Sequence, residues 1–94
     1  MSWTRATVLA EVRSVIVEHA DEGTEVGDST ELVSDLGIDS LGVMELVGDL
    51  EDRFRLRITD ADLRDVVTLA DVARAIALRL EGEGRLHANE EGKP

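Results

Sequence analysis

Apolar residues recur at helical spacing between residues 40 and 54, and this pattern constrains the fold more than any other stretch of the chain. At about 100° per residue, five apolar side chains form one continuous stripe: Val43, Leu46, Val47, Leu50 and Phe54. The opposite face mixes acidic residues with two apolar ones, Leu41 and Met44. The pattern predicts an α-helix from about residue 40 to 53, with one face in a core and the other exposed.

Two more stretches repeat apolar residues at the same spacing, one toward each end of the chain. The first covers residue 4 to about 20, and the last covers about 69 to 80. The only proline is Pro94, so no proline interrupts these helices. His19 lies at the end of the first helix without an apparent acid–base partner, and we expect it to be structural or solvent-facing rather than catalytic.

Polar residues three positions apart mark the starts of two helices. Thr59 with Asp62, and Thr68 with Asp71, have the spacing of a capping box. The first pair opens a short helix over about residues 60–64, and the second pair opens the last helix. No metal site is expected from any of these acidic residues.

A long connection, residues 21–39, joins the first helix to the second and exceeds the usual length of a structureless loop. Asp28 with Glu31 predicts a capped helical turn near residues 29–34. Three long helices and one short helix, each apolar on one face, predict an all-α fold, a small four-helix bundle with a long first loop. Residues 1–80 are expected to form the single domain, and residues 81–94, which lack periodicity, a disordered tail.

The negative charge of the chain is concentrated around the second helix. The net charge is −11; residues 21–52 contain eleven acidic residues and no Lys or Arg, while the remainder contains ten of each sign. Such a field disfavours nucleic acid and membrane partners and favours proteins with basic patches. Cysteine is absent, and no stretch has the length of a membrane span or the apolar core of a signal peptide. A cytoplasmic, free-standing monomer is expected.

The loop before the second helix carries the most specific motif, DLGIDSL over residues 35–41. At the start of an acidic amphipathic helix, it resembles the Asp-Leu-Gly-x-Asp-Ser-Leu signature of acyl carrier proteins, and the resemblance extends over about residues 8–80. In that family the serine carries 4′-phosphopantetheine through a phosphodiester bond. The resemblance therefore implies that Ser40 is the covalent attachment site. It also implies a non-catalytic carrier that shuttles thioester-bound acyl intermediates of polyketide or fatty acid biosynthesis.

The resemblance also implies a docking surface for a phosphopantetheinyl transferase and for acyl-loading, condensing and other biosynthetic enzymes with basic patches. The residues expected to contact these partners are Asp39, Leu41, Met44, Glu45, Glu51 and Asp52. Gly42 and Gly48 are small residues on the outer face, where they allow another surface to approach closely; on that ground Gly48 joins the docking set. Family members often carry an acid at the position of Gly42, so one acidic contact is missing here.

Two other functions remain open from the sequence. A peptidyl or aminoacyl carrier is one, although such carriers usually show Gly-Gly-x-Ser in place of Asp-Ser-Leu. An unmodified acidic helical adaptor is the other, in which Ser40 would only cap the helix. A serine hydroxyl is a poor nucleophile without a base, and no His or Lys is near Ser40 in the sequence. A carrier of this kind would therefore need an external enzyme for its modification.

Overall fold

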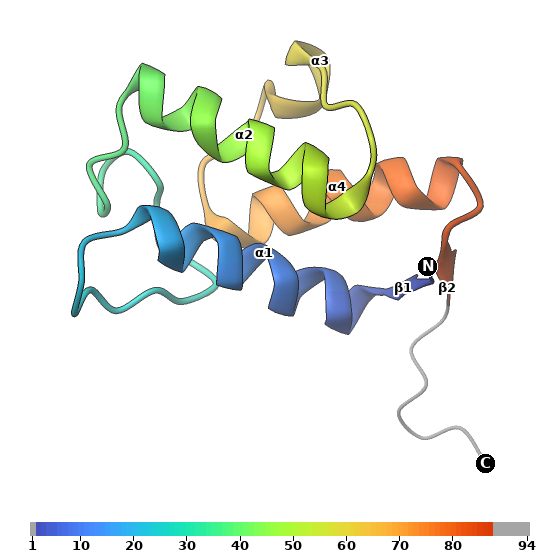
Figure 1. Cartoon of the computed structure of the whole chain (residues 1–94), viewed down its shortest axis with the longest axis horizontal. Helices are drawn as coiled ribbons and strands as arrows, with labels where there is room; N and C mark the ends of the chain where they lie inside the picture. The colour runs from blue at the N-terminus through green and yellow to red at the C-terminus, as the bar shows by residue number, and fades with distance from the viewer. Residues whose placement is uncertain (1, 88–94) are drawn as a thin grey trace.

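The computed structural model describes residues 2–87, and four helices make up most of the fold (Figure 1). These are α1 (Arg5–His19), α2 (Ser40–Phe54), α3 (Asp60–Leu63) and α4 (Leu69–Gly82). Helix α1 packs against α4 and α2, and α3 packs against α4. The predicted small all-α bundle is confirmed, with every helix end within two residues of its expected position. No helix within residues 2–87 is long and apolar enough to cross a membrane.

Each helix begins at a polar side chain that accepts a hydrogen bond from an N–H of the first turn. The four caps are Thr4, Asp39, Thr59 and Thr68. The two capping boxes predicted from the sequence, at Thr59 and Thr68, are both present. At the second box, the N–H groups of Thr68 and Val67 each donate to Asp71 at 3.0 Å, and these bonds hold the pKa of Asp71 below its usual value.

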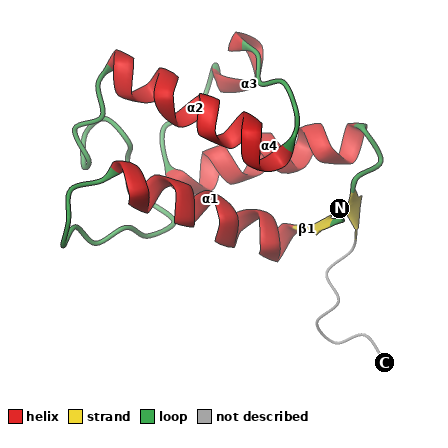
Figure 2. Cartoon of the chain, viewed as in Figure 1, coloured by secondary structure: helices red, strands yellow, loops and turns green. Residues whose placement is uncertain are grey.

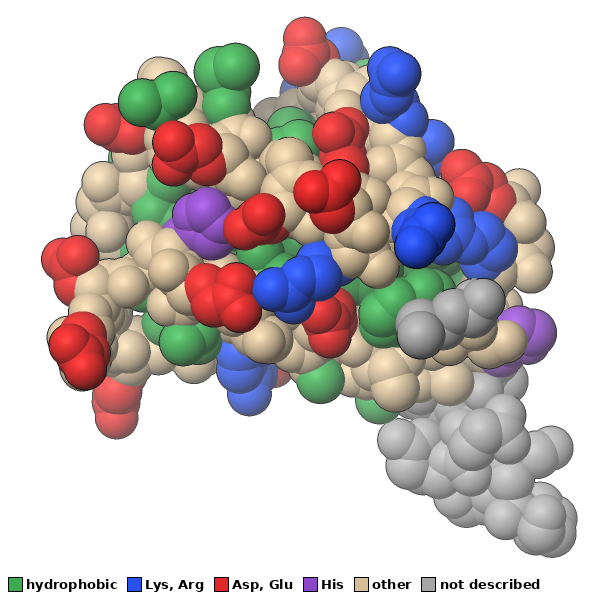
Figure 3. Space-filling model, in the orientation of Figure 1, with side chains coloured by type: hydrophobic (Ala, Val, Ile, Leu, Met, Phe, Trp, Pro, Cys, Tyr) green, Lys and Arg blue, Asp and Glu red, His purple; other side chains and the backbone are tan. Residues whose placement is uncertain are grey.

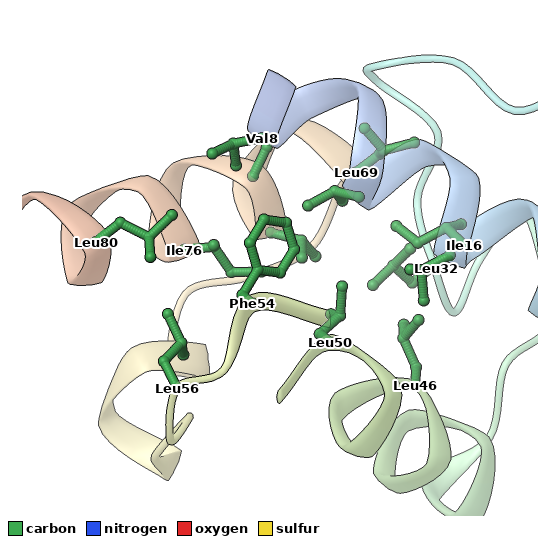
Figure 4. Close-up of a cluster of buried hydrophobic side chains, with 14 of the residues drawn as sticks. Val8, Ile16, Leu32, Leu46, Leu50, Phe54, Leu56, Leu69, Ile76 and Leu80 are labelled. Carbon is green, nitrogen blue, oxygen red and sulfur yellow. The ribbon is translucent and has the colours of Figure 1, made fainter. Parts of the chain in front are cut away.

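One core of aliphatic side chains fills the space between α1, α2 and α4 (Figure 4). Its largest fully buried members are Phe54, Ile16, Leu46, Leu50, Leu69 and Leu80. The apolar stripe of α2 is not buried evenly. Leu46, Leu50 and Phe54 are buried, whereas Val43 and Val47 at its edge are only half-buried. Among the described residues no polar or charged side chain is buried, so the polar groups of the fold all lie at its surface.

Polar contacts fix α2 against α1 at two places. Arg53 bridges to α1 through Glu11 at 2.6 Å and Glu18 at 3.1 Å, and these hydrogen bonds raise the pKa of Arg53. At the last residue of α1, Nε2 of His19 lies 2.8 Å from Oδ2 of Asp49, with 19% of the His19 side chain exposed. His19 is therefore structural, one of the two roles expected for it. Its partner is far away in the sequence and gives no local signal.

The long connection forms helical turns over residues 31–37, slightly later than the turn predicted near residues 29–34. The N–H of Asp35 donates to the carbonyl of Glu31 and the N–H of Gly37 donates to the carbonyl of Val33, both at 2.9 Å. Residues 32–36 form turns, the N–H of Leu32 donates to the carbonyl of Val67 at 3.0 Å, and residue 31 makes an antiparallel bridge to residue 68. The expected cap, Asp28, directs its carboxylate to Arg13 of α1 instead. The connection is thus fastened to both α1 and α4.

The two ends of the described chain meet in a pair of parallel strands, β1 (Trp3–Thr4) and β2 (Leu86–His87) (Figure 2). This pairing corrects the predicted tail, because residues 81–87 belong to the fold: α4 continues to residue 82 and the chain then turns back to β1. The rest of that predicted tail, residues 88–94, lies outside the described residues. Pairing between opposite ends of a chain leaves no local period, so the sequence pattern could not show it.

Arg85 and Trp3 anchor this end of the bundle to the end of α2. The Arg85 guanidinium donates to the carbonyl of Arg55 at 3.0 Å and to that of Phe54. The Trp3 indole packs on the Phe54 ring, with centroids 4.5 Å apart. Gly84, with φ of +72°, forms the turn that brings β2 into place. The terminal strands therefore lie at the end of the bundle away from the start of α2 (Figure 1).

Candidate functional site

Ser40 is the first residue of α2 and is exposed at one end of the bundle. Asp39, the residue before it, caps the helix, and its Oδ1 accepts the N–H of Gly42 at 2.8 Å. The capping role considered for Ser40 is thus filled by Asp39. Within residues 2–87 the Ser40 hydroxyl has no hydrogen-bond partner, so it is free to react.

The turn before α2 leaves no room for a side chain at position 42. A Cβ added to Gly42 would lie 2.9 Å from Cγ2 of Ile38 and 3.3 Å from Oδ1 of Asp39. Ile38 is buried and β-branched, so its methyl group has little freedom to move. The packing of the loop under α2 therefore gives this glycine a structural role, in addition to the close approach of a partner expected from the sequence. At Gly48, by contrast, an added Cβ meets nothing within 4 Å.

Two apolar side chains stand out from the first turns of α2. Leu41 and Met44 are 64% and 70% exposed, as the helical pattern predicted. Glu45 and Asp52 are also exposed, and neither forms an ion pair with another residue in the described range. Figure 3 shows acidic and hydrophobic side chains together over the start of α2, whereas most of the basic side chains on this face gather toward its other end. The surface around Ser40 is thus apolar contact area surrounded by negative charge.

Two carboxylates of α2 are engaged within the fold. Oε2 of Glu51 accepts the N–H of Ile58 at 2.8 Å and so fastens the connection after α2. Asp49 holds His19, and no hydrogen bond joins that ring to Ser40 in the described part of the chain. Glu51, a residue of the expected docking set, therefore has a structural bond as well. No residue in the described range is placed to activate the Ser40 hydroxyl.

An apolar cavity of about 290 Å³ lies between the long connection, α2, α3 and the start of α4. Val43, three residues after Ser40, lines it together with Val47 and with Leu63 of α3. No pattern in the sequence indicates this cavity, because its walls come from segments that are far apart in the chain. The available signal in the sequence was the edge of the α2 stripe, where Val43 and Val47 lie; in the structure both are half-buried.

A phosphodiester on Oγ of Ser40 fits this geometry. The hydroxyl is exposed, the free N–H groups of the first turn lie at the start of a fifteen-residue helix, and that turn contains no acidic residue. The helix dipole favours a negative group at such a position, and the carboxylate of Asp39 opposes it in part. No group of three or more metal-ligating side chains that could hold an ion occurs within residues 2–87.

Comparisons with known proteins identify the family. The family model described as a phosphopantetheine attachment site matches residues 8–76. The chain belongs to the acyl carrier protein family. It is 35% identical over 79 residues to the acyl carrier protein of Thermotoga maritima, which covers 82% of this chain and 96% of that protein.

A solved structure extends the likeness within the family. It is named as a candidate acyl carrier protein from Mycobacterium tuberculosis, with 30% identity and a TM-score of 0.62 over 77% of this chain and 97% of that one. Acyl carrier proteins hold 4′-phosphopantetheine covalently and are themselves non-catalytic. The chain is therefore an acyl carrier protein that carries phosphopantetheine.

Proposed function

We propose that Ser40 bears the 4′-phosphopantetheine and that the carrier domain extends beyond residue 80 to residue 87, with the terminal strands closing its far end. The observation that carries this proposal is the state of the Ser40 hydroxyl, which is exposed, free of hydrogen bonds and placed at the start of α2 by a neighbouring cap. A structural serine at a helix start would use its hydroxyl in the cap. Here Asp39 makes that bond, and the Ser40 hydroxyl remains available for the modification.

Attachment from coenzyme A forms a bond between Oγ of Ser40 and the phosphorus of the phosphopantetheine. It breaks the pyrophosphate bond of coenzyme A, so that 3′,5′-ADP leaves, and the hydroxyl proton passes to a base. The described residues supply none, so we assign the base to a phosphopantetheinyl transferase. The exposed apolar residues Leu41 and Met44, with Asp39, Glu45, Gly48, Glu51 and Asp52, form the docking surface in this proposal. The acidic side chains of this surface attract the basic patches of the transferase and of later biosynthetic enzymes, and the apolar side chains among them supply contact area.

The cavity supports an acyl cargo of fatty acid or polyketide type over an aminoacyl one. Its walls are largely apolar, and it begins at Val43, one helical turn from Ser40. Each methylene buried there would contribute up to about 0.8 kcal/mol. We further place the carrier in the cytoplasm as a monomer, as the sequence analysis expects.

The test of attachment is the intact mass after incubation with coenzyme A and a broad-specificity transferase. The wild type should gain the mass of one phosphopantetheine, and Ser40→Ala should gain none. Ser34→Ala is the matched control, because Ser34 is also exposed in the same region and should leave modification unchanged. An unmodified wild type beside a modified control carrier would reject the proposal and favour the adaptor function.

The test of docking is the initial rate of the same modification. Met44→Ala and Glu45→Ala should each slow it several-fold, because both side chains are exposed at the start of α2. Val17→Ala and Glu22→Ala remove an exposed apolar and an exposed acidic side chain elsewhere and serve as controls. Equal rates for all four variants would show that docking does not use this face.

A further inference from the structure

Helix α3 is the part of the cavity wall that depends least on burial. It consists of only four residues, Asp60–Leu63, and none of them is buried. Its first turn is closed by the capping box, in which the N–H of Thr59 donates to Oδ2 of Asp62 at 2.8 Å. With little apolar area removed from water, α3 needs polar contacts to stay in place.

Arg79 of α4 supplies those contacts. Its Nη1 lies 2.5 Å from Oδ2 of Asp62 and 2.5 Å from the carbonyl oxygen of Arg57, the residue that leads into α3. One guanidinium therefore joins α4 both to the helix and to its approach. The Arg79 and Asp62 side chains are 30% and 19% exposed, so water competes only in part for this contact.

The ionisation of Asp62 agrees with this arrangement. Partial burial raises the pKa of Asp62, but hydrogen bonds from Thr59 and Arg79 outweigh it, and the pKa lies below its usual value. The carboxylate is therefore charged at neutral pH, which is the state that binds a guanidinium most strongly.

Leu63 lines both the cavity and a second space on the side of Arg79. The cavity of about 290 Å³ and a void of about 10 Å³ share three wall residues, Leu63 of α3, Leu50 of α2 and Val72 of α4. The far wall of the void includes Ile76 and Arg79 itself. An outward movement of α3 would withdraw Leu63 and join the two spaces into one longer cavity.

We propose that Arg79 is a positioning residue that limits the length of the acyl cargo, because it holds α3 closed over the end of the cavity. The proposal rests on the proposed function, in which the cavity receives the acyl chain. Arg79 does not line the cavity of about 290 Å³. It holds α3 and its approach through Asp62 and Arg57, and its other ion pair, with Glu83, stays near the end of α4. When the contacts of Arg79 with Asp62 and Arg57 are lost, the cavity extends toward Ile76, and longer chains are accommodated.

The test compares the thermal stabilisation that acyl chains of increasing length confer on the carrier. The transferase loads Ser40 from butanoyl, hexanoyl, octanoyl, decanoyl and dodecanoyl coenzyme A, and each Tm is referred to the unacylated holo form of the same variant. In the wild type the gain in Tm should rise with chain length and then level off. We call the chain length at which the gain in Tm stops rising the levelling point. In Arg79→Leu the levelling point should be longer than in the wild type by two or more carbons.

Matched variants separate cargo length from stability. Arg74→Leu removes an arginine from the same helix that pairs only with Asp71 of α4, and its levelling point should equal that of the wild type. Arg79→Lys keeps a cation beside Asp62 and should return the levelling point toward the wild-type length. A folded Arg79→Leu variant that levels off at the wild-type length would overturn the proposal.

A second variant decides the matter if Arg79→Leu does not fold. Leu63→Ala removes a side chain that lines both spaces, and its levelling point should also move to longer chains. An unchanged levelling point in Leu63→Ala overturns the proposal, as does a modified wild type that no acyl chain stabilises. Absence of any modification of the wild type is a different outcome, since it rejects the proposed function itself.

Discussion

Replacing Gly42 and Gly48 with alanine should change the stability of the fold in opposite directions, although both residues lie in α2. In a helix interior, alanine is favoured over glycine by up to about 1 kcal/mol, since the unfolded glycine chain is more flexible. At Gly48 nothing lies within 4 Å of the added Cβ, so this gain should appear in full. Gly48→Ala should therefore raise Tm by about 4–8 °C, the shift expected per kcal/mol for a domain of this size.

At Gly42 a clash outweighs the same gain. The added Cβ would lie 2.9 Å from Cγ2 of Ile38, a buried side chain with a restricted χ1, and 3.3 Å from the cap oxygen of Asp39. Overpacking of this kind costs about 1–3 kcal/mol. Set against the gain of up to about 1 kcal/mol, the net loss should be up to about 2 kcal/mol. The two variants should differ by the cost of the clash, about 1–3 kcal/mol, which is at least about 4 °C in Tm.

Thermal unfolding followed by far-ultraviolet circular dichroism measures both variants in one experiment, with urea unfolding as a check on the free energies. The reasoning would be refuted if Gly42→Ala melted at or above the wild-type temperature. It would also fail if the two variants shifted Tm by the same amount, since the packing around Ile38 is the only difference invoked.

Four further expectations concern the cap, the docking glycine, pH and salt. Asp39→Ala should lower the stability by about 1 kcal/mol and Asp39→Asn by less, because asparagine keeps the oxygen acceptor; urea titrations that rank them otherwise contradict the cap. Gly48→Ala should slow modification by the transferase while it raises Tm; an unchanged rate removes Gly48 from the docking surface. Asp62 and Asp71 have lowered pKa values in the folded state, so the stability they provide is complete above about pH 4 and is lost as the pH falls through those values. Acid titration of wild type and Asp71→Asn checks this, since the variant should lose less stability below pH 4. Added salt or divalent cations should raise Tm by screening the eleven acidic residues of the 21–52 stretch, and a Tm that stays flat or falls contradicts that view.

The helices were predictable because their determinants are local. The apolar stripe of α2 and the Thr–x–x–Asp caps of α3 and α4 each lie within one or two turns of sequence. The exposure of Leu41 and Met44 followed from the same helical period. Each of these features depends on residues close together in the chain, where spacing alone carries the information.

The remainder depends on contacts between distant segments, and no local pattern records them. Three contacts each join separate elements: the bond of Asp49 to His19, the hydrogen bond from the N–H of Ile58 to Glu51, and the pairing of β1 with β2. The same holds for the cavity, whose four walls meet only in the folded chain. The need for glycine at position 42 has a different cause. Ile38 is only four residues away, but the position of its side chain depends on the conformation of the loop.

The packing of Trp3 determines what optical measurements on this protein can detect. The chain has one tryptophan and no tyrosine, so its intrinsic fluorescence comes from Trp3. That indole is 8% exposed and lies on Phe54, beside the terminal strands and away from the start of α2. Its emission should respond when the terminal strands detach and stay silent when cargo is loaded on Ser40. Circular dichroism senses all four helices together, so a fluorescence transition that precedes it would show that the terminal end opens as a unit of its own.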